Sequence, residues 1–180
     1  MLSFSQDCKT LDNFVAFHGV KFGSPFPDSL RKYCQVKYNQ QRSDSIFMIW
    51  EEEVKKKKQF QEWVNVRQSF SYAAISALKD GRVYLVLLQH PINIDDTLLI
   101  SQKFYPLFYS SVCDELMSVF GKFSKEEIFE DLFSKELVRT WDCEKMKIEF
   151  SMGLTTFRTY TLTITDKKLD KERKILKYTN

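Results

Sequence analysis

Glycine and proline are scarce in this sequence. Its 180 residues include only 5 Gly and 4 Pro, and no stretch is rich in Gly, Pro or Ser. Flexible linkers between domains are built from such stretches, so we expect residues 1–180 to form a single domain. A chain of this length buries roughly two thirds of its unfolded surface on folding. The 16 Phe, 8 Tyr and 3 Trp predict a core rich in aromatic side chains.

Long apolar runs and strong net charge are also missing. No window approaches the roughly 18 apolar residues that a transmembrane helix needs, so no transmembrane segment is predicted. The net charge of +3 is too small to indicate nucleic-acid or membrane binding from the overall field alone. Residues 1–4 are too short for the apolar region of a signal peptide. Two localisations stay open: a cytoplasmic protein, or an exported, periplasmic one whose signal has been removed.

Motifs for metals, cofactors and common enzyme chemistry are absent. The four cysteines, Cys8, Cys34, Cys113 and Cys143, include no CxxC pair and no zinc-site spacing. They permit three pairings, and the sequence favours none of them. There is no Gly-x-Ser-x-Gly elbow, no Gly-rich phosphate loop and no His-Glu-x-x-His motif. We therefore expect no metal and no cofactor, and an enzyme is the less favoured class.

Several segments have the patterns of antiparallel strands. Asp80-Gly81 lies between two apolar runs, which predicts a type I′ hairpin with a central strand over residues 83–88. Residues 44–50 are apolar on both faces, which is typical of a strand covered on both sides. Residues 146–152 and 160–164 alternate between apolar and polar side chains, as strands with one buried face do.

Helical spacing is found in two further segments. Residues 105–120 carry apolar side chains every fourth position, and Gly121 follows where a left-handed cap would end the helix. Residues 124–135 predict a second, short amphipathic helix, with Ser124 as N-cap and Glu127 three residues later. The predicted fold class is α+β: an antiparallel sheet meander packed against one long helix and one or two short helices.

Two charged segments admit alternatives. Residues 51–58 contain three Glu followed by four Lys, which suits either a helix with i,i+4 ion pairs or a hairpin turn before a strand over residues 60–72. The basic C-terminal tail, residues 167–180, is either a packed helical turn or a frayed end.

The segment from residue 102 to residue 166 resembles small exported bacterial α+β domains. The likeness rests on Phe120-Gly121-Lys122 at the end of the main helix and on a Trp-bearing strand at Trp141, within a layout in which a helix followed by a sheet meander occurs twice. The families are the BamE/SmpA outer-membrane assembly lipoproteins and the beta-lactamase inhibitor protein. The chain departs from the lipoproteins in lacking a lipid-attachment cysteine at its N-terminus. The resemblance implies a non-enzymatic binding module of a bacterial envelope, and it transfers no functional residue.

The candidate binding residues lie on the last predicted strand and beside the basic run. Thr159, Thr161 and Thr163 form a row on one face of a strand, with Arg158 next to it. Such a row is ordinary for an exposed strand face, but it also suits recognition of another protein. Trp63 is the further candidate.

The function most favoured by the sequence is therefore binding to another protein, as an accessory, inhibitor or immunity-type factor of bacterial type. One alternative is a small enzyme in which Cys113 or Cys143 meets His18 or His90. Another is weak nucleic-acid binding through residues 55–58, which the neighbouring acidic residues 51–53 disfavour. The sequence does not indicate an oligomeric state.

Overall fold

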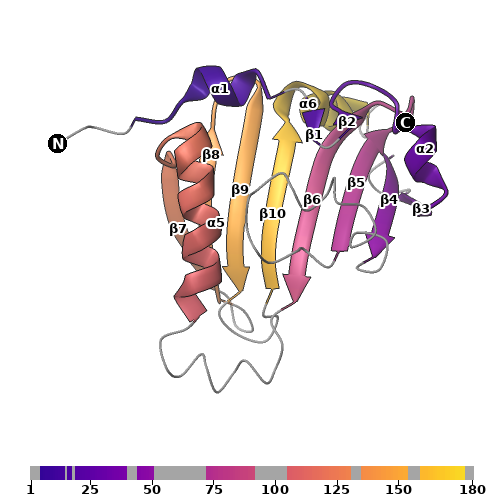
Figure 1. Cartoon of the computed structure of the whole chain (residues 1–180). Coiled ribbons are helices and arrows are strands. Elements are labelled where there is room, and N and C mark those ends of the chain that lie inside the picture. Colours follow the sequence, from indigo (N-terminus) through magenta and orange to yellow (C-terminus); the bar gives the residue numbers. More distant parts are fainter. Residues whose placement is uncertain are drawn as a thin grey trace.

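The protein is built on one antiparallel sheet of eight strands (Figure 1). The computed structural model describes residues 5–14, 16–17, 19–39, 44–50, 72–91, 105–130, 135–153 and 159–176. In chain order the elements are α1 (Cys8–Asp12), β1 (Ala16–Phe17), β2 (Val20–Lys21), α2 (Asp28–Arg31), β3 (Gln35–Asn39), β4 (Asp44–Trp50), β5 (Tyr72–Leu78), β6 (Val83–Pro91), α5 (Tyr105–Phe120), β7 (Lys125–Glu130), β8 (Lys135–Asp142), β9 (Met146–Gly153), β10 (Thr159–Asp166) and α6 (Lys167–Leu176).

The sheet consists of two four-stranded meanders joined side by side. The strand order is β3-β4-β5-β6-β10-β9-β8-β7, and every neighbouring pair is antiparallel. The last strands of the two meanders, β6 and β10, pair in the middle of the sheet. A helix precedes each meander, α2 before β3 and α5 before β7. The predicted α+β class with an antiparallel sheet is thus confirmed, whereas the described helices are mostly short and none is clearly long.

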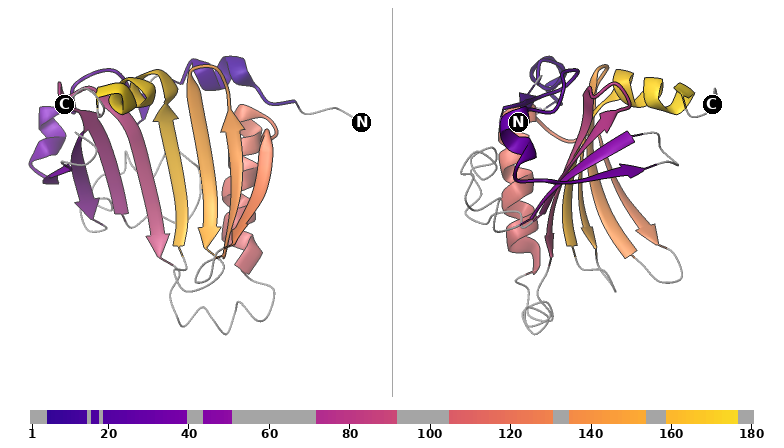
Figure 2. Two further views of the ribbon diagram at one scale, coloured as in Figure 1. Left: turned by 180° about the vertical axis from the view of Figure 1, so that it is seen from behind. Right: turned by 90° about the vertical axis from the view of Figure 1, so that its right-hand side faces the viewer.

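Helices are a minor part of the structure. Among the described helices only α5, with 16 residues, and α6, with 10 residues, are longer than two turns. α5 lies across one face of the sheet, while α6 projects on the other side (Figure 2). The predicted bounds of α5 and its glycine cap are confirmed: the Gly121 N–H donates to the Met117 carbonyl at 3.0 Å, with φ of 73° at Gly121.

The main core lies on the face of the sheet that carries α5 (Figure 1): α5 packs over the second meander, and residues 20–30 of the N-terminal segment pack over the first, where Phe26 stacks on Phe47. Alternate side chains of the strands point into it, as the period-two patterns predicted. Its buried side chains include Phe47, Ile49 and Ile75 of the first meander, Trp141, Ile148, Phe150, Leu162 and Ile164 of the second, Val112, Leu116 and Phe120 of α5, and Leu11, Phe22 and Phe26 of the N-terminal segment.

The predicted helix over residues 124–135 is wrong. Residues 125–130 form strand β7, which pairs with β8 from Lys125↔Thr140 to Glu130↔Lys135. Ser124 is not a helix cap: its N–H and its hydroxyl both donate to the Thr140 carbonyl, at 2.8 and 2.9 Å. The amphipathic pattern was compatible with either element, and pairing with β8 satisfied the backbone groups that a helix would have satisfied internally.

The central hairpin is confirmed, but its turn differs from the prediction. β5 and β6 pair in the interior of the sheet. The Gly81 N–H donates to the Leu78 carbonyl at 2.8 Å, and the Leu78 N–H donates to the Arg82 carbonyl at 2.9 Å. The connection is therefore a three-residue loop with glycine in the left-handed region (φ 90°), and not a two-residue type I′ turn.

β4 occupies a position nearer the edge than its composition suggested. It lies between β5 and the edge strand β3. Phe47 and Ile49 are in the main core, while on the other face Met48 is buried and Ile46 is half-buried. The predicted strand over residues 60–72 lies, apart from Tyr72, outside the described residues, and so does the choice between helix and turn for residues 51–58.

The N-terminal segment is tied to the second meander. A disulfide links Cys8 in α1 to Cys143 after β8, a pairing that the sequence did not favour over others. The Asp12 carboxylate accepts hydrogen bonds from the N–H groups of Lys145 and Met146, at 2.8 and 3.0 Å. The Asp7 N–H donates to the Phe120 carbonyl at 2.7 Å. α1 therefore fixes the end of α5 relative to the β8–β9 turn.

Candidate functional site

The face of the sheet opposite α5 carries the candidate residues, and we call it the open face. On β10 the buried Tyr160, Leu162 and Ile164 point into the main core. The intervening threonines, Thr159, Thr161, Thr163 and Thr165, therefore point to the open face. The first three are half-buried, and Thr165 is 9% exposed. The predicted threonine row is thus present and partly accessible.

The residues on the two sides of the threonine row differ: those on the β6 side are mainly apolar, and those on the β9 side are polar. On the β6 side the row faces Leu85, Leu87 and Gln89, and the Gln89 amide donates to the Thr161 hydroxyl at 3.4 Å. On the β9 side it faces Lys147, Glu149 and Ser151. The row is the boundary between these two sides. The two remaining candidates, Trp63 and Arg158, lie outside the described residues.

The helix α6 borders the open face, and it is docked through both apolar and charged contacts. Leu169 is 5% exposed and packs with Leu78 and Tyr84 in a second, small hydrophobic cluster. The Arg173 guanidinium lies 5.5 Å from the centre of the Tyr84 ring, a cation–π arrangement. Of the two alternatives for the C-terminal segment, residues 167–176 form a packed helix.

An ion-pair chain joins α6 to the central hairpin. Arg82 donates to both carboxylate oxygens of Glu172, at 3.3 and 2.5 Å. Asp80 in the hairpin loop accepts hydrogen bonds from the N–H and the Nε of Arg82. Although partial burial opposes it, these hydrogen bonds hold the pKa of Asp80 below its ordinary value. Asp80 therefore orients Arg82 toward the helix.

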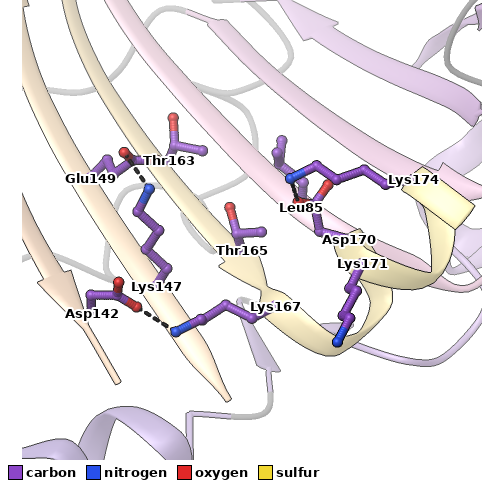
Figure 3. Close-up of a pocket in the computed structure, with 10 residues that line it drawn as sticks. All are labelled: Leu85, Asp142, Lys147, Glu149, Thr163, Thr165, Lys167, Asp170, Lys171 and Lys174. Atoms are coloured by element: carbon purple, nitrogen blue, oxygen red, sulfur yellow. Dashed lines mark hydrogen bonds and ion pairs between the residues drawn. The ribbon is translucent and has the colours of Figure 1, made fainter. Parts of the chain in front are cut away.

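A hollow of about 470 Å³ lies where α6 meets the open face (Figure 3). Thr163, Thr165 and Leu85 contribute from the strands in the middle of the sheet. The charged lining residues are Lys147, Lys167, Lys171, Lys174, Asp142, Glu149 and Asp170.

Most charges of this hollow compensate one another. Ion pairs join Lys147 to Glu149 at 2.6 Å, Lys167 to Asp142 at 2.7 Å, and Lys174 to Asp170 at 2.7 Å. These groups are between about one fifth and three fifths exposed, so the pairs add little stability. As a result, the wall of the hollow is polar but has no strong electrostatic field of one sign.

Beneath α6 lies a buried carboxylate, Asp44, with 0% exposure. Its Oδ2 accepts a hydrogen bond from the Tyr84 hydroxyl, and its Oδ1 has no hydrogen-bond partner among the described residues. Burial, together with the hydrogen bond to Asp44, raises the pKa of Tyr84 above its ordinary value. Tyr84 therefore acts as a neutral donor that links the carboxylate to the underside of α6.

The cysteines proposed for an enzymatic alternative are not exposed thiols. Cys143 is in the disulfide with Cys8, and Cys113 is 0% exposed in the main core. Burial raises the pKa of the remaining thiol, Cys34, to about 11, which disfavours the reactive thiolate. His90 is half-buried on β6, whereas His18 lies outside the described residues.

Metal-binding clusters and membrane-spanning helices are both absent from the described part of the chain. It contains no group of three or more His, Cys, Asp or Glu side chains arranged to hold a metal ion. None of its helices combines the length and the apolar character needed to cross a membrane.

The sequence left α6 as one of two alternatives and indicated neither its place beside the open face nor the buried Asp44–Tyr84 pair. One local signal for α6 was present, because Asp170 is followed at i+3 and i+4 by Arg173 and Lys174, and both pairs form in the helix. No local signal marked Asp44, whose partner is 40 residues away.

Comparison of the chain with protein-family models, with curated proteins and with solved structures finds no significant match.

Proposed function

We propose that this protein is a non-enzymatic binding module that recognises another protein through its open face. The observation that carries the proposal is the asymmetry of the sheet. α5 and the main core cover one face, whereas the other presents the half-buried Thr159, Thr161 and Thr163 beside the docked helix α6. A sheet face that is left partly accessible and bounded by a fixed wall is suited to receive a partner.

The chemistry of the open face supports a protein partner. Leu85 and Leu87 are half-buried on one side of the threonine row, and Lys147 and Glu149 lie on the other. This mixture of apolar and polar groups is typical of non-obligate protein interfaces. The ion pairs in the hollow leave no concentration of positive charge that would favour nucleic acid.

The disulfide between Cys8 and Cys143 supports an oxidising compartment. Of the two localisations left open by the sequence, we therefore favour the exported one. This setting agrees with the resemblance to binding domains of the bacterial envelope. The class of partner that follows is another exported or surface protein.

Site-specific photo-crosslinking tests the proposal. A photoreactive amino acid at position 161 would lie on the open face, and one at position 119 would lie on α5, where Val119 is 49% exposed. We expect a discrete protein adduct in source cells from position 161 and none from position 119. We also expect a second substitution on the open face, Thr163→Arg, to abolish the adduct without lowering the melting temperature. Adducts from position 119 alone, or from neither position, would contradict the use of this face.

A further inference from the structure

The two edges of the sheet carry most of the exposed apolar side chains. Six large hydrophobic side chains are exposed among the described residues, and four of them belong to edge strands: Val36 and Tyr38 on β3, and Ile128 and Phe129 on β7, each 54–59% exposed. Edge strands also present unpaired backbone N–H and C=O groups, and natural proteins usually protect them with charges, proline or bulges. Both edge strands here contain charged residues, but their apolar side chains remain exposed as well.

From these edges we propose that the protein associates head to tail, with β3 of one copy adding to β7 of a second copy. The interaction goes beyond the proposed function, because it uses the edges of the sheet and leaves its open face available. The partner is a second copy of this chain, and the contact is an antiparallel continuation of the eight-stranded sheet.

The strand order allows a second copy to continue the sheet in the same orientation as the first copy. In the described part of the chain, every neighbouring pair in the sheet is antiparallel and the strands number eight. β3 and β7, at the two ends, therefore run in opposite directions. When β3 of the next copy lies beside β7, the two strands are antiparallel and the open faces of both copies lie on the same side.

One register pairs all five residues of β3 with residues of β7 and brings together one pair of opposite charges and one apolar pair. Lys37 and Glu127 both point to the open face, and Val36 and Ile128 both point to the other face, as the sheet register shows. Placing Lys37 opposite Glu127 also places Val36 opposite Ile128. The remaining opposed pairs are Tyr38 with Glu126, Gln35 with Phe129, and Asn39 with Lys125. No like charges face each other, and opposite charges and apolar pairs across strands are stabilising.

Symmetric pairing of identical edges is less favourable. If the β3 strands of two copies pair about a two-fold axis in the register with the longest overlap, Lys37 of one copy lies opposite Lys37 of the other. Two β7 strands in their longest registers oppose either Glu127 with Glu127 or Glu126 with Glu130. Like charges directly opposite are destabilising, so the charge pattern selects unlike edges. A contact between unlike edges leaves one edge of each end copy unused, so association continues beyond a dimer, into open chains or a closed ring.

Charge reversal with rescue tests the contact. Five paired residues make a small interface, which predicts weak association, detectable by sedimentation at concentrations of about 0.1–1 mM. K37E places two carboxylates opposite each other, and E127K places two ammonium groups opposite each other. Each variant alone should associate about tenfold more weakly than the wild type. An equimolar mixture should recover wild-type association, because every contact between unlike variants restores an opposite-charge pair.

Two variants with the same changes of charge serve as controls. K168E and E144K alter exposed residues of α6 and of the β8–β9 turn, away from both edges, and should associate like the wild type. A wild-type protein that stays monomeric throughout the concentration range would overturn the proposal. So would a mixture of K37E and E127K that associates no better than either variant alone.

A second pair of variants distinguishes unlike from like edges. V36E blocks β3 and I128E blocks β7, and both residues are more than half exposed, so folding should be unaffected and can be checked by melting temperature. Each variant alone should be monomeric, while their mixture should form a 1:1 complex that does not grow, because one intact edge remains on each. A dimer formed by either variant alone would show that identical edges pair and would contradict the proposal.

Discussion

At the scale of single residues, Gly121 occupies a position that admits no side chain. Its φ is 73°, and a Cβ there would lie 2.3 Å from the Ser5 carbonyl oxygen and 2.9 Å from the Asp7 nitrogen. The glycine is thus required both to end α5 and to let the N-terminal segment approach. Its carbonyl also accepts a hydrogen bond from Trp141 Nε1 at 2.8 Å.

We predict that Gly121→Ala lowers the free energy of unfolding by about 3 kcal/mol, because the left-handed conformation costs about 1 kcal/mol and the clash is with backbone that must move. Gly81→Ala is the matched control. Gly81 has a φ of 90° but nothing lies within 4 Å of its Cβ position, so only the conformational cost of about 1 kcal/mol applies. Urea denaturation of both variants measures the difference, and equal losses would contradict the close approach at Gly121.

The buried Asp44 depends on one hydroxyl. Tyr84→Phe removes the donor to Oδ2, and Oδ1 already lacks a partner among the described residues. A buried carboxylate left without hydrogen bonds costs about 3 kcal/mol, so we expect a loss of this size in the free energy of unfolding. Tyr38→Phe removes a hydroxyl from a residue that is 54% exposed and should stay within about 0.5 kcal/mol. If Tyr84→Phe leaves the free energy of unfolding unchanged, the Asp44 carboxylate must accept hydrogen bonds from another group.

At the scale of elements, β6 has two apolar faces with different surroundings. Val86 and Leu88 point into the main core and are 0% and 2% exposed, whereas Leu85 and Leu87 point to the open face and are half-buried. The apolar residues on both faces of residues 83–88 therefore predicted a central strand correctly. They did not show that the main core covers only one of its faces.

This difference predicts unequal effects of the same substitution at neighbouring positions. Leu88→Ala should cost about 2–5 kcal/mol, because it leaves a cavity in the main core. Leu87→Ala should cost about 1 kcal/mol, because its site is partly open to solvent and little burial is lost. Chemical denaturation of the two variants gives both values. Equal losses would mean that the open face at Leu87 is covered as fully as the core.

At the scale of the whole molecule, the disulfide connects the first helix to the second meander across 135 residues of sequence. It joins α1 to the end of β8, where Asp12 also holds the β8–β9 turn. A cross-link over so long a loop restricts the unfolded chain strongly, although measured stabilisation is typically about 2–4 kcal/mol.

We expect the double substitution of Cys8 and Cys143 by Ser to lower the melting temperature by about 5–15 °C, since 1 kcal/mol corresponds to about 2–4 °C in a domain of this size. Dithiothreitol should lower the melting temperature of the wild type similarly and leave that of the double variant unchanged. Cys34→Ser, which alters a free cysteine, is the control and should respond to dithiothreitol like the wild type. A wild-type protein unaffected by reductant would contradict the pairing.

Local patterns in the sequence determined the elements whose partners are close or whose periodicity is unambiguous. Apolar spacing and Gly121 marked α5, Asp80-Gly81 marked the central hairpin, and period-two alternation marked β9 and β10. The threonine row on one strand face followed from the same alternation. These features depend on interactions between residues that are near in sequence, so composition and spacing are sufficient to reveal them.

The tertiary structure alone decided the features that depend on distant partners. Residues 125–130 had a pattern that fitted a helix, and only the presence of β8 made them a strand. The pairing of Cys8 with Cys143, the hydrogen bond between Tyr84 and Asp44, and the docking of α6 through Arg82 and Glu172 join segments between 40 and 135 residues apart. Spacing along the chain carries no information about such contacts, because they form only when distant segments have been brought together in the folded sheet.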